Sequence, residues 1–331
     1  MSAEYGNIVE QNRNNLQDVI PLSTPYAICV DPSNLCNFRC HFCAVQYSDE
    51  KFYFKKQVMD LNLFKKIVCD ISEFDKPLKV LRMNGQGEPL VNPNFPEMVS
   101  YAKKAGIAEK IETITNGSLL NPELNDRLIS CGIDRIRISI ESIDAEGYKN
   151  ITGKNVNFED FIENIRDLHE KSGDCEIYCK IVDVAVPNEE DKDHFKEIIS
   201  GVCDRYFIDR VIPLWSDYDE IKKVMVGDDE GVHGQRIKHI KICPYPFYSL
   251  IVNPDGEVTA CCADWKRKYV VGNLQQESLL SVWNGPKLRK MWKKLASGQK
   301  DDFEMCRKCV LPSFDCNDDI DEYGDLILSK L

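Results

Sequence analysis

Three cysteines near the start of the chain have a spacing that suits metal chemistry. Cys36, Cys40 and Cys43 lie in the stretch DPSNLCNFRCHFCAV and are spaced C-x3-C-x2-C. Thiolates this close together can bind a soft metal or an iron–sulfur cluster. A structural zinc site needs four ligands, and His41 lies inside the loop, where we expect it to point away from the cysteines. A four-iron cluster held by three cysteines leaves one iron open to an outside ligand, so the missing fourth ligand is predicted to be functional. Structural zinc and buried free thiols remain the alternatives.

A second group of cysteines follows in the C-terminal region. It comprises Cys243, the adjacent pair Cys261 and Cys262, the C-x2-C pair Cys306 and Cys309, and Cys316. Cys243, Cys261, Cys306 and Cys309 are enough for one fully ligated cluster, and the same four thiolates would suit structural zinc. Adjacent strand residues point to opposite faces, which makes Cys262 a neighbour of the ligands. We interpret Cys316 as a free thiol, a replacement ligand or a hydrogen-atom donor.

Composition restricts the class of protein. The 331 residues include 15 cysteines, and 43% are hydrophobic. We find no run of 18 apolar residues, so no membrane span is expected. The N-terminus lacks the apolar segment of a secretory signal, which favours the cytoplasm, where thiols stay reduced and clustered cysteines indicate metal binding or catalysis. The net charge of −12 argues against a nucleic-acid partner.

Strand-like and helix-like segments alternate along the first two thirds of the chain. A helix is predicted over 158–171 from its apolar spacing, with Asn157 as its cap; Asp60 and Asn121 are expected to cap two others, and Pro122 fits a first helical turn. Helical crossovers imply a parallel sheet, and six such units predict an open or partial (β/α)6 barrel. The strands are expected at 26–33, 79–87, 111–117, 135–142, 176–186 and 205–214.

The pattern changes after Trp215. Residues 247–264 read as a hairpin turning at Asn253-Pro254-Asp255-Gly256, residues 278–295 as a helix interrupted near Gly285-Pro286, and the acidic end as a solvated tail. The predicted organisation is an N-terminal extension (1–24), the barrel (25–215), a polar linker (216–241) and a small C-terminal lobe (242–331).

The first cysteine motif, on the first βα loop of a six-unit barrel, resembles that of radical S-adenosylmethionine (SAM) enzymes. The resemblance implies a four-iron cluster whose open iron binds the amino and carboxyl groups of SAM, and cleavage of SAM to methionine and a 5′-deoxyadenosyl radical. Phe42 matches the aromatic residue that precedes the third cysteine in the family, which makes it a predicted adenine contact.

Other predicted SAM contacts follow from the same resemblance. Gly85, Gly87 and Glu88 stand where the family has a Gly-Gly-Glu-like motif; the glycines would let the backbone approach the methionine moiety, and Glu88 would accept from its ammonium. Ser139 and Glu141 match the position of ribose-binding groups, and Asn116 ends the third predicted strand. An ordinary turn or strand-end hydrogen bond is the alternative for each.

The second cysteine group resembles the SPASM auxiliary-cluster domain of the same family. The spacing from Cys243 through Gly256 to Cys261, the hairpin and the later Leu-Leu-Ser-Val-Trp-Asn-Gly all fit. Because only Cys316 remains after Cys309, the pattern resembles the truncated "twitch" version, found in an aminocyclitol dehydrogenase. The resemblance implies two [4Fe-4S] clusters, one that binds SAM and one auxiliary.

The reaction predicted from this resemblance is a two-electron dehydrogenation of a small polar substrate, such as a sugar, aminocyclitol or nucleotide-linked sugar. The auxiliary cluster would accept the electron, and flavodoxin or ferredoxin would be the electron donor. The roughly 24 residues before the first strand are too few for a leader-peptide-binding domain, which favours a small substrate, and a peptide-modifying enzyme remains an alternative. So do an epimerase with Cys316 or Cys262 as hydrogen donor, and a metal-stabilised binding protein on a decayed scaffold. Six residues could face the barrel mouth, although each also suits a structural role: Tyr53, Arg137, Lys180, Arg210, Trp215 and Asp217.

Overall fold

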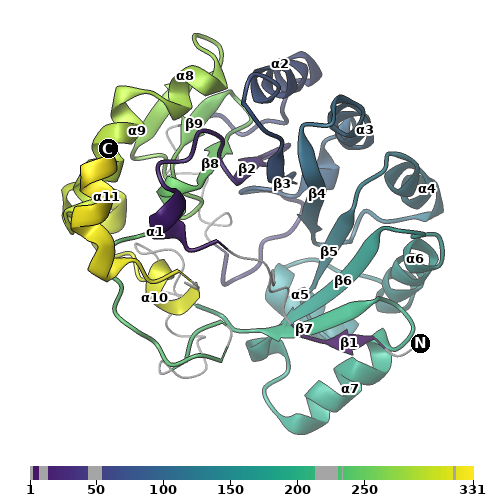
Figure 1. Ribbon diagram of the computed structural model, residues 1–331. Helices are drawn as coiled ribbons and strands as arrows, with labels where there is room; N and C mark the ends of the chain where they lie inside the picture. The colour runs from purple at the N-terminus through teal and green to yellow at the C-terminus, as the bar shows by residue number, and fades with distance from the viewer. Residues whose placement is uncertain (1–2, 7–13, 44–53, 213–229, 233, 316–317) are drawn as a thin grey trace.

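Six parallel strands form the centre of the fold. Each pairs with the next in sequence order, and the sheet curves into an open barrel with helices on its outer face (Figure 1). These strands confirm the predicted partial barrel: β2 (Ala27–Val30), β3 (Leu78–Arg82), β4 (Ala108–Thr115), β5 (Arg135–Ile140), β6 (Glu176–Val182) and β7 (Arg205–Asp209). The structure, a computed structural model, describes residues 3–6, 14–43, 54–212, 230–232, 234–315 and 318–331.

The helices of the barrel lie outside the sheet because each is apolar on one side only. In α2, Phe64, Ile67 and Val68 are buried, and each such side chain contributes roughly 1.5–3 kcal/mol to folding. The side chains of Asp60, Asn121 and Asn157 accept backbone N–H groups as predicted caps. None of the helices in the described ranges is both long and apolar enough to cross a membrane. The barrel helices are α2 (Leu61–Ile71), α3 (Phe95–Ala105), α4 (Pro122–Ser130), α5 (Ala145–Thr152), α6 (Phe158–Glu170) and α7 (Glu189–Ile199).

The N-terminal segment takes part in the sheet, which the sequence did not lead us to expect. Strand β1 (Glu4–Tyr5) pairs in parallel with β7 at the edge of the barrel. The short helix α1 (Leu16–Val19) follows, and its Leu16 is buried in the core. Helix α5 is a second unpredicted element, inserted between β5 and α6.

The C-terminal lobe continues the same sheet. Strand β8 (Ser249–Val252) pairs in parallel with β2, and β9 (Glu257–Thr259) and β10 (Val270–Asn273) extend the sheet in antiparallel fashion. The predicted hairpin is therefore confirmed. So is the helix break, because α8 (Leu279–Trp283) ends just before α9 (Pro286–Ala296). The lobe and the first barrel strand thus share backbone hydrogen bonds.

The prediction of a solvated acidic tail was wrong for the end of the chain. Helix α11 (Gly324–Lys330) buries Ile327, and Ile320 just before it is buried as well. These apolar side chains, spaced between acidic ones, fix the segment against the lobe. Most of the predicted linker lies outside the described residues, so the domain boundaries stay a prediction. The remaining short helices are α10 (Leu311–Asp315) and the 3₁₀ turns η2 (Pro89–Val91), η3 (Asp183–Ala185), η5 (Tyr245–Phe247), η6 (Lys300–Asp302), η7 (Glu304–Cys306) and η8 (Asp321–Tyr323).

Candidate functional site

The loop after β2 carries the first three cysteines at the carboxyl end of the sheet. Cys36, Cys40 and Cys43 are half-buried. The backbone N–H groups of Arg39 and His41 donate to carbonyls at the end of α5, at 2.9 and 3.1 Å. The helix that the sequence analysis missed therefore fixes the cysteine loop from outside.

A glycine-rich loop after β3 lies directly against the base of the cysteine loop. Asp31 accepts the backbone N–H of Gln86 at 3.1 Å through Oδ2 and that of Ser33 at 3.1 Å through Oδ1. A Cβ atom on Gly85 would overlap the side chain of Asp31, and one on Gly87 would overlap the carbonyl of Ser33. Both glycines are thus required for the contact between the two loops, and their contact with the methionine moiety stays a prediction.

Glu88 is buried where the glycine-rich loop meets the end of β4. Its Oε1 accepts from the Thr115 hydroxyl at 2.6 Å and from the Leu90 N–H at 3.0 Å, and Oε2 accepts the Asn116 N–H at 2.7 Å. Burial raises the pKa of this carboxyl group, and these donors oppose the shift. Glu88 therefore holds two strand ends together, and any bond to an ammonium group would add to these three.

Asn116 connects the end of β4 to the cysteine loop. Its Nδ2 donates to Asn37 Oδ1 at 2.9 Å and lies 3.9 Å from Cys36 Sγ. Its Oδ1 accepts from Ser118 Oγ at 2.7 Å, and Asn37 Nδ2 donates to the same hydroxyl at 2.8 Å. The three polar side chains form a closed ring of hydrogen bonds beside a cysteine sulfur.

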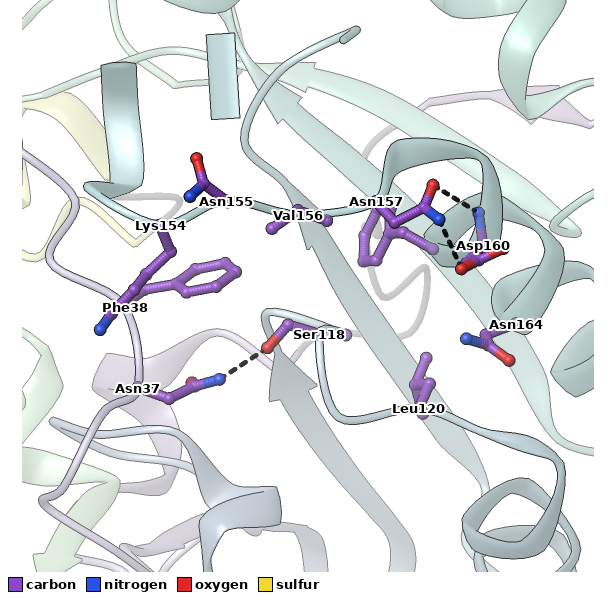
Figure 2. Close-up of a pocket in the computed structure, with 12 residues that line it drawn as sticks. Asn37, Phe38, Ser118, Leu120, Lys154, Asn155, Val156, Asn157, Asp160 and Asn164 are labelled. Carbon is purple, nitrogen blue, oxygen red and sulfur yellow. Dashed lines mark hydrogen bonds between the residues drawn. The ribbon is translucent and has the colours of Figure 1, made fainter. Parts of the chain in front are cut away.

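A cavity of about 430 Å³ lies on the outer side of this loop. Figure 2 shows Asn37 and Phe38 on one wall and the start of α6 on the opposite wall. The first cysteine loop therefore has a polar, hollowed surface beside it. The lining residues are mostly amides and small polar groups, with the rings of Phe38 and Phe161 between them: Asn37, Gly117, Ser118, Leu120, Lys154, Asn155, Val156, Asn157, Asp160 and Asn164.

The end of β5 brings Ser139 and Glu141 to the same edge of the sheet. Glu141 is buried, and burial raises the pKa of its carboxyl group to about 7, although Lys180 opposes the shift. Its backbone N–H donates to the Tyr148 hydroxyl at 3.2 Å. Phe42 is half-buried in the cysteine loop. Binding of SAM by these side chains stays a prediction.

Four cysteines of the C-terminal region line one pocket. They come from three separate segments: before η5, after β9 and around η7. Burial raises the pKa of Cys306 to about 12 and raises that of Cys309. Thiols in such surroundings ionise readily only beside a metal. The pocket is formed by Cys243, Cys261, Cys306 and Cys309 with Pro246, Ala263, Met291, Leu295, Lys300, Met305, Leu311 and Pro312.

The donor set of this pocket suits an iron–sulfur cluster. In the part of the chain that the structure describes, no three His, Cys, Asp or Glu side chains are grouped so that they could hold a single metal ion. A tetrahedral zinc would bring four thiolates to about 3.8 Å from one another. Four thiolates are also the full ligand set of one [4Fe-4S] cluster.

Of the two candidate hydrogen donors, Cys262 lies within the described residues and Cys316 does not. Cys262 is exposed, whereas the adjacent Cys261 is buried. Both lie beyond β9, which ends at Thr259, so the alternation of strand residues does not apply to them. Cys316 lies outside the described residues, and so do Tyr53, Trp215 and Asp217. Arg137 and Lys180 lie on strands β5 and β6 as predicted.

Sequence reasoning missed an ion-pair network inside the barrel. Glu112 on β4 is bonded by Arg82, Arg135 and Arg137 from the neighbouring strands. Parallel strands are normally apolar on both faces. The charged residues within two predicted strands, Glu112 in one and Arg135 and Arg137 in the other, were therefore the signal that could have revealed the ion-pair network.

Comparison with known families decides the identity of the fold. The model of the radical SAM superfamily matches residues 30–200, just over half of the 331 residues. The chain belongs to the radical SAM superfamily. The model of the SPASM iron–sulfur cluster-binding domain matches residues 243–310. As a radical SAM protein with this second domain, the chain uses SAM and [4Fe-4S] clusters, one that binds SAM and one auxiliary.

Similar proteins cover several activities. The chain is 38% identical over 106 residues to the cofactor-modifying protein of a tungsten-containing aldehyde ferredoxin oxidoreductase from Pyrococcus furiosus, matching 32% of the chain and 28% of that protein. It is 32% identical over 126 residues to GTP 3′,8-cyclase from Mesorhizobium japonicum, matching 37% of the chain and 36% of the cyclase. The matches thus span about a third of the length of these relatives.

Solved structures share the fold over most of the chain. BtrN in complex with AdoMet and 2-DOIA has a TM-score of 0.56 at 18% identity, covering 86% of this chain and 92% of BtrN. Streptococcus suis SuiB bound to S-adenosylmethionine has a TM-score of 0.60 at 13% identity, covering 87% of this chain and 72% of SuiB. At these identities the similarity shows the fold alone.

Proposed function

We propose that this radical SAM enzyme oxidises a small polar substrate by two electrons. The observation that carries the proposal is the pocket of four cysteines in the C-terminal lobe. Four thiolates ligate every iron corner of one cluster and leave none for a substrate. A closed cluster of this kind suits electron transfer, which a dehydrogenation requires.

The ligands follow from the two cysteine groups. Cys36, Cys40 and Cys43 hold the SAM-binding cluster, and Cys243, Cys261, Cys306 and Cys309 hold the auxiliary one. When bound, the first cluster would supply the electron that cleaves SAM to the 5′-deoxyadenosyl radical, and the auxiliary cluster would accept the electron that the substrate radical gives up as it loses a proton.

The surrounding residues orient SAM. Glu88 and Asn116 hold the ends of β3 and β4 against the cysteine loop through the hydrogen bonds described above. Ser139 and Glu141 offer acceptors at the end of β5 for the ribose hydroxyls, and Phe42 contacts the adenine. Gly85 and Gly87 keep the glycine-rich loop close enough for the methionine moiety to lie over it.

The substrate class proposed is a sugar, an aminocyclitol or a nucleotide-linked sugar. The fold similarity to BtrN, whose structure holds AdoMet and 2-DOIA, supports a small polar substrate. A structure of SuiB bound to its precursor peptide keeps peptide modification as the competing class. We place the enzyme in the cytoplasm, where thiols stay reduced, with flavodoxin or ferredoxin as the electron donor.

One observation favours a second reaction, epimerisation. The thiol of Cys262 is exposed, next to a buried proposed ligand, and it lies within electrostatic reach of Arg82 inside the barrel. A thiol on the inner side can return a hydrogen atom to a substrate radical.

Mass spectrometry of the product separates the two reactions. Dehydrogenation predicts a product two mass units lighter than the substrate, without deuterium at the reacting carbon in heavy water. Epimerisation predicts an unchanged mass in ordinary water and one deuterium gained per turnover in heavy water, lost in Cys262→Ala. Deuterium gain without oxidation would refute the dehydrogenase proposal. Absence of 5′-deoxyadenosine from the reconstituted protein would instead favour a binding protein on a decayed scaffold.

A further inference from the structure

A row of polar side chains crosses the inner face of the barrel. Residues that pair in register on neighbouring strands project to the same face of a sheet. The register aligns Cys29 with Arg82, Arg82 with Glu112, Glu112 with Arg135, and Arg135 with Glu176. The helices cover the other face (Figure 1), so this row faces the barrel interior.

The row itself holds two arginines and two acids, and Arg137, two residues beyond Arg135 on β5, adds a third arginine to this group. Glu112, which is 3% exposed, accepts from Arg82 Nε at 2.8 Å, Arg135 Nη1 at 3.0 Å and Arg137 Nη2 at 3.2 Å. Arg135 has Glu176 as a second partner at 2.6 Å. Arg82 and Arg137 are therefore left to share the single charge of Glu112.

Both of these arginines keep donor groups for a further partner. Arg82 uses Nε for Glu112, and 42% of its side chain is exposed although it projects into the barrel. Arg137 Nε is buried and has no hydrogen-bond partner among the residues that the structure describes. The guanidinium of Arg137 lies 5.9 Å from the ring centre of Tyr178, and this contact helps to fix the orientation of the planar group. The charge of Lys180, by contrast, is already paired with that of Asp209, at 3.0 Å.

Arg82 also lies between the two cysteine groups. It is the last residue of β3 and precedes the glycine-rich loop that contacts the first cysteine loop. On the other side it is within electrostatic reach of Cys262, next to the pocket of the lobe. A group bound at Arg82 would therefore have one cluster site on each side.

We propose that Arg82 and Arg137 form a binding site for an anionic group of the substrate, a carboxylate or a phosphate. The proposal rests on the proposed function, since it assigns a charge to the substrate of the same site. Guanidinium groups donate to carboxylate and phosphate in a matching fork geometry. An anion would compensate the charge that Glu112 leaves unpaired.

Calorimetry on the reconstituted holoenzyme saturated with SAM tests this site. The probes are malonate and inorganic phosphate, with malonamide as the neutral analogue of malonate. Both anions are expected to bind at least tenfold more tightly than malonamide. Arg82→Gln and Arg137→Gln should each weaken anion binding about 10- to 100-fold, because hydrogen bonds to charged groups carry most of the affinity. Lys79→Gln, on the same strand but paired with Glu109 at the surface, is the control and should change nothing.

The outcomes decide the proposal in either case. Tighter binding of malonate identifies a carboxylate as the recognised group, and tighter binding of phosphate identifies a phosphate. Iron content and SAM affinity of the same samples show whether a variant is folded; if one is not, the other arginine variant decides. Anions that bind no better than malonamide, or that bind equally well to folded Arg82→Gln and Arg137→Gln, would overturn the site. Formation of 5′-deoxyadenosine is measured separately, so that failure of the proposed enzymatic function can be distinguished from failure of the proposed anion site.

Discussion

The two cysteine groups of this chain are built in opposite ways. The first lies on one loop of eight residues, surrounded by polar side chains such as Asn116 and Glu88, with an open cavity of about 430 Å³ beside it. The second is assembled from three segments around a pocket lined by Met291, Leu295 and Leu311. The first group lies beside polar side chains and next to a cavity lined by its neighbours Asn37 and Phe38, and the second lies among apolar side chains.

This difference separates binding from electron transfer. A cluster that must bind SAM needs an open iron and polar partners for the charged groups of its ligand. A cluster that only exchanges electrons is best closed and shielded from water. In the lobe, the proposed ligands would also cross-link the segments before η5, after β9 and around η7, so metal binding and folding are expected to be coupled there.

The sharpest test of the contrast removes the first group. Replacing Cys36, Cys40 and Cys43 by Ala is expected to abolish formation of 5′-deoxyadenosine and to remove about half of the iron. The barrel should stay folded, because its hydrogen bonds and helices do not depend on the loop. Parental rates of SAM cleavage in this triple variant would show that the assignment of the loop is wrong.

Removing one ligand of the second group should affect stability as well as activity. Cys306→Ala breaks the link between the η7 segment and the end of β9, so soluble yield and melting temperature are expected to fall along with turnover. The thiol Cys69 serves as the matched control, because it is exposed on α2 and far in sequence from the lobe. Full stability and full turnover of Cys306→Ala would remove the structural role of this cluster.

The barrel should respond to acid rather than to loss of metal. Burial alone would raise the pKa of Glu112, but Arg137, Arg82 and Arg135 outweigh it and hold the pKa at about 2, below the ordinary 4.5. The network therefore stabilises the fold fully above about pH 4.5, and this contribution is lost as the pH falls towards 2. A shift of this size corresponds to about 3 kcal/mol. Denaturant unfolding of wild type and Glu112→Gln between pH 7 and pH 3 measures it, and curves that stay equally far apart at both pH values would contradict the account.

The smallest expected effect concerns the potential of the first cluster alone. Asn116 Nδ2 lies 3.9 Å from Cys36 Sγ, and hydrogen bonds to cluster sulfurs favour the reduced state. Asn116→Leu should therefore lower the reduction potential of the SAM-binding cluster and leave the auxiliary one unchanged. A redox titration followed by electron paramagnetic resonance reads both clusters in one sample. Equal shifts of both reduction potentials, or no shift of either, would show that the ring of Asn37, Asn116 and Ser118 does not tune the SAM-binding cluster.

The sequence predicted the elements whose pattern is local. The six barrel strands, the caps at Asp60, Asn121 and Asn157, and the hairpin of the lobe all follow from short-range periodicity and side-chain chemistry. The cysteine motifs were equally visible, because their spacing is itself the signal.

What the sequence did not reveal depends on contacts between distant segments. Nothing local indicates that β1 pairs with β7 or that β8 continues the sheet beside β2. The prediction for the acidic end failed because the many charged residues around Ile320 and Ile327 gave no local sign that these two side chains are buried. Nor did the sequence reveal that Gly85 and Gly87 are needed for close contact with the loop that carries the first cysteines; their contact with SAM stays a prediction.

The central claim is that one cluster binds SAM and the other does not. Electron paramagnetic resonance spectra of the reduced holoenzyme, recorded with and without SAM, test it most directly. The account predicts that SAM changes the signal of one cluster, that this signal is absent from the variant lacking Cys36, Cys40 and Cys43, and that the remaining signal is the same with and without SAM. A spectrum that SAM leaves unchanged in the wild type, or a SAM-dependent signal that persists in the triple variant, would contradict it.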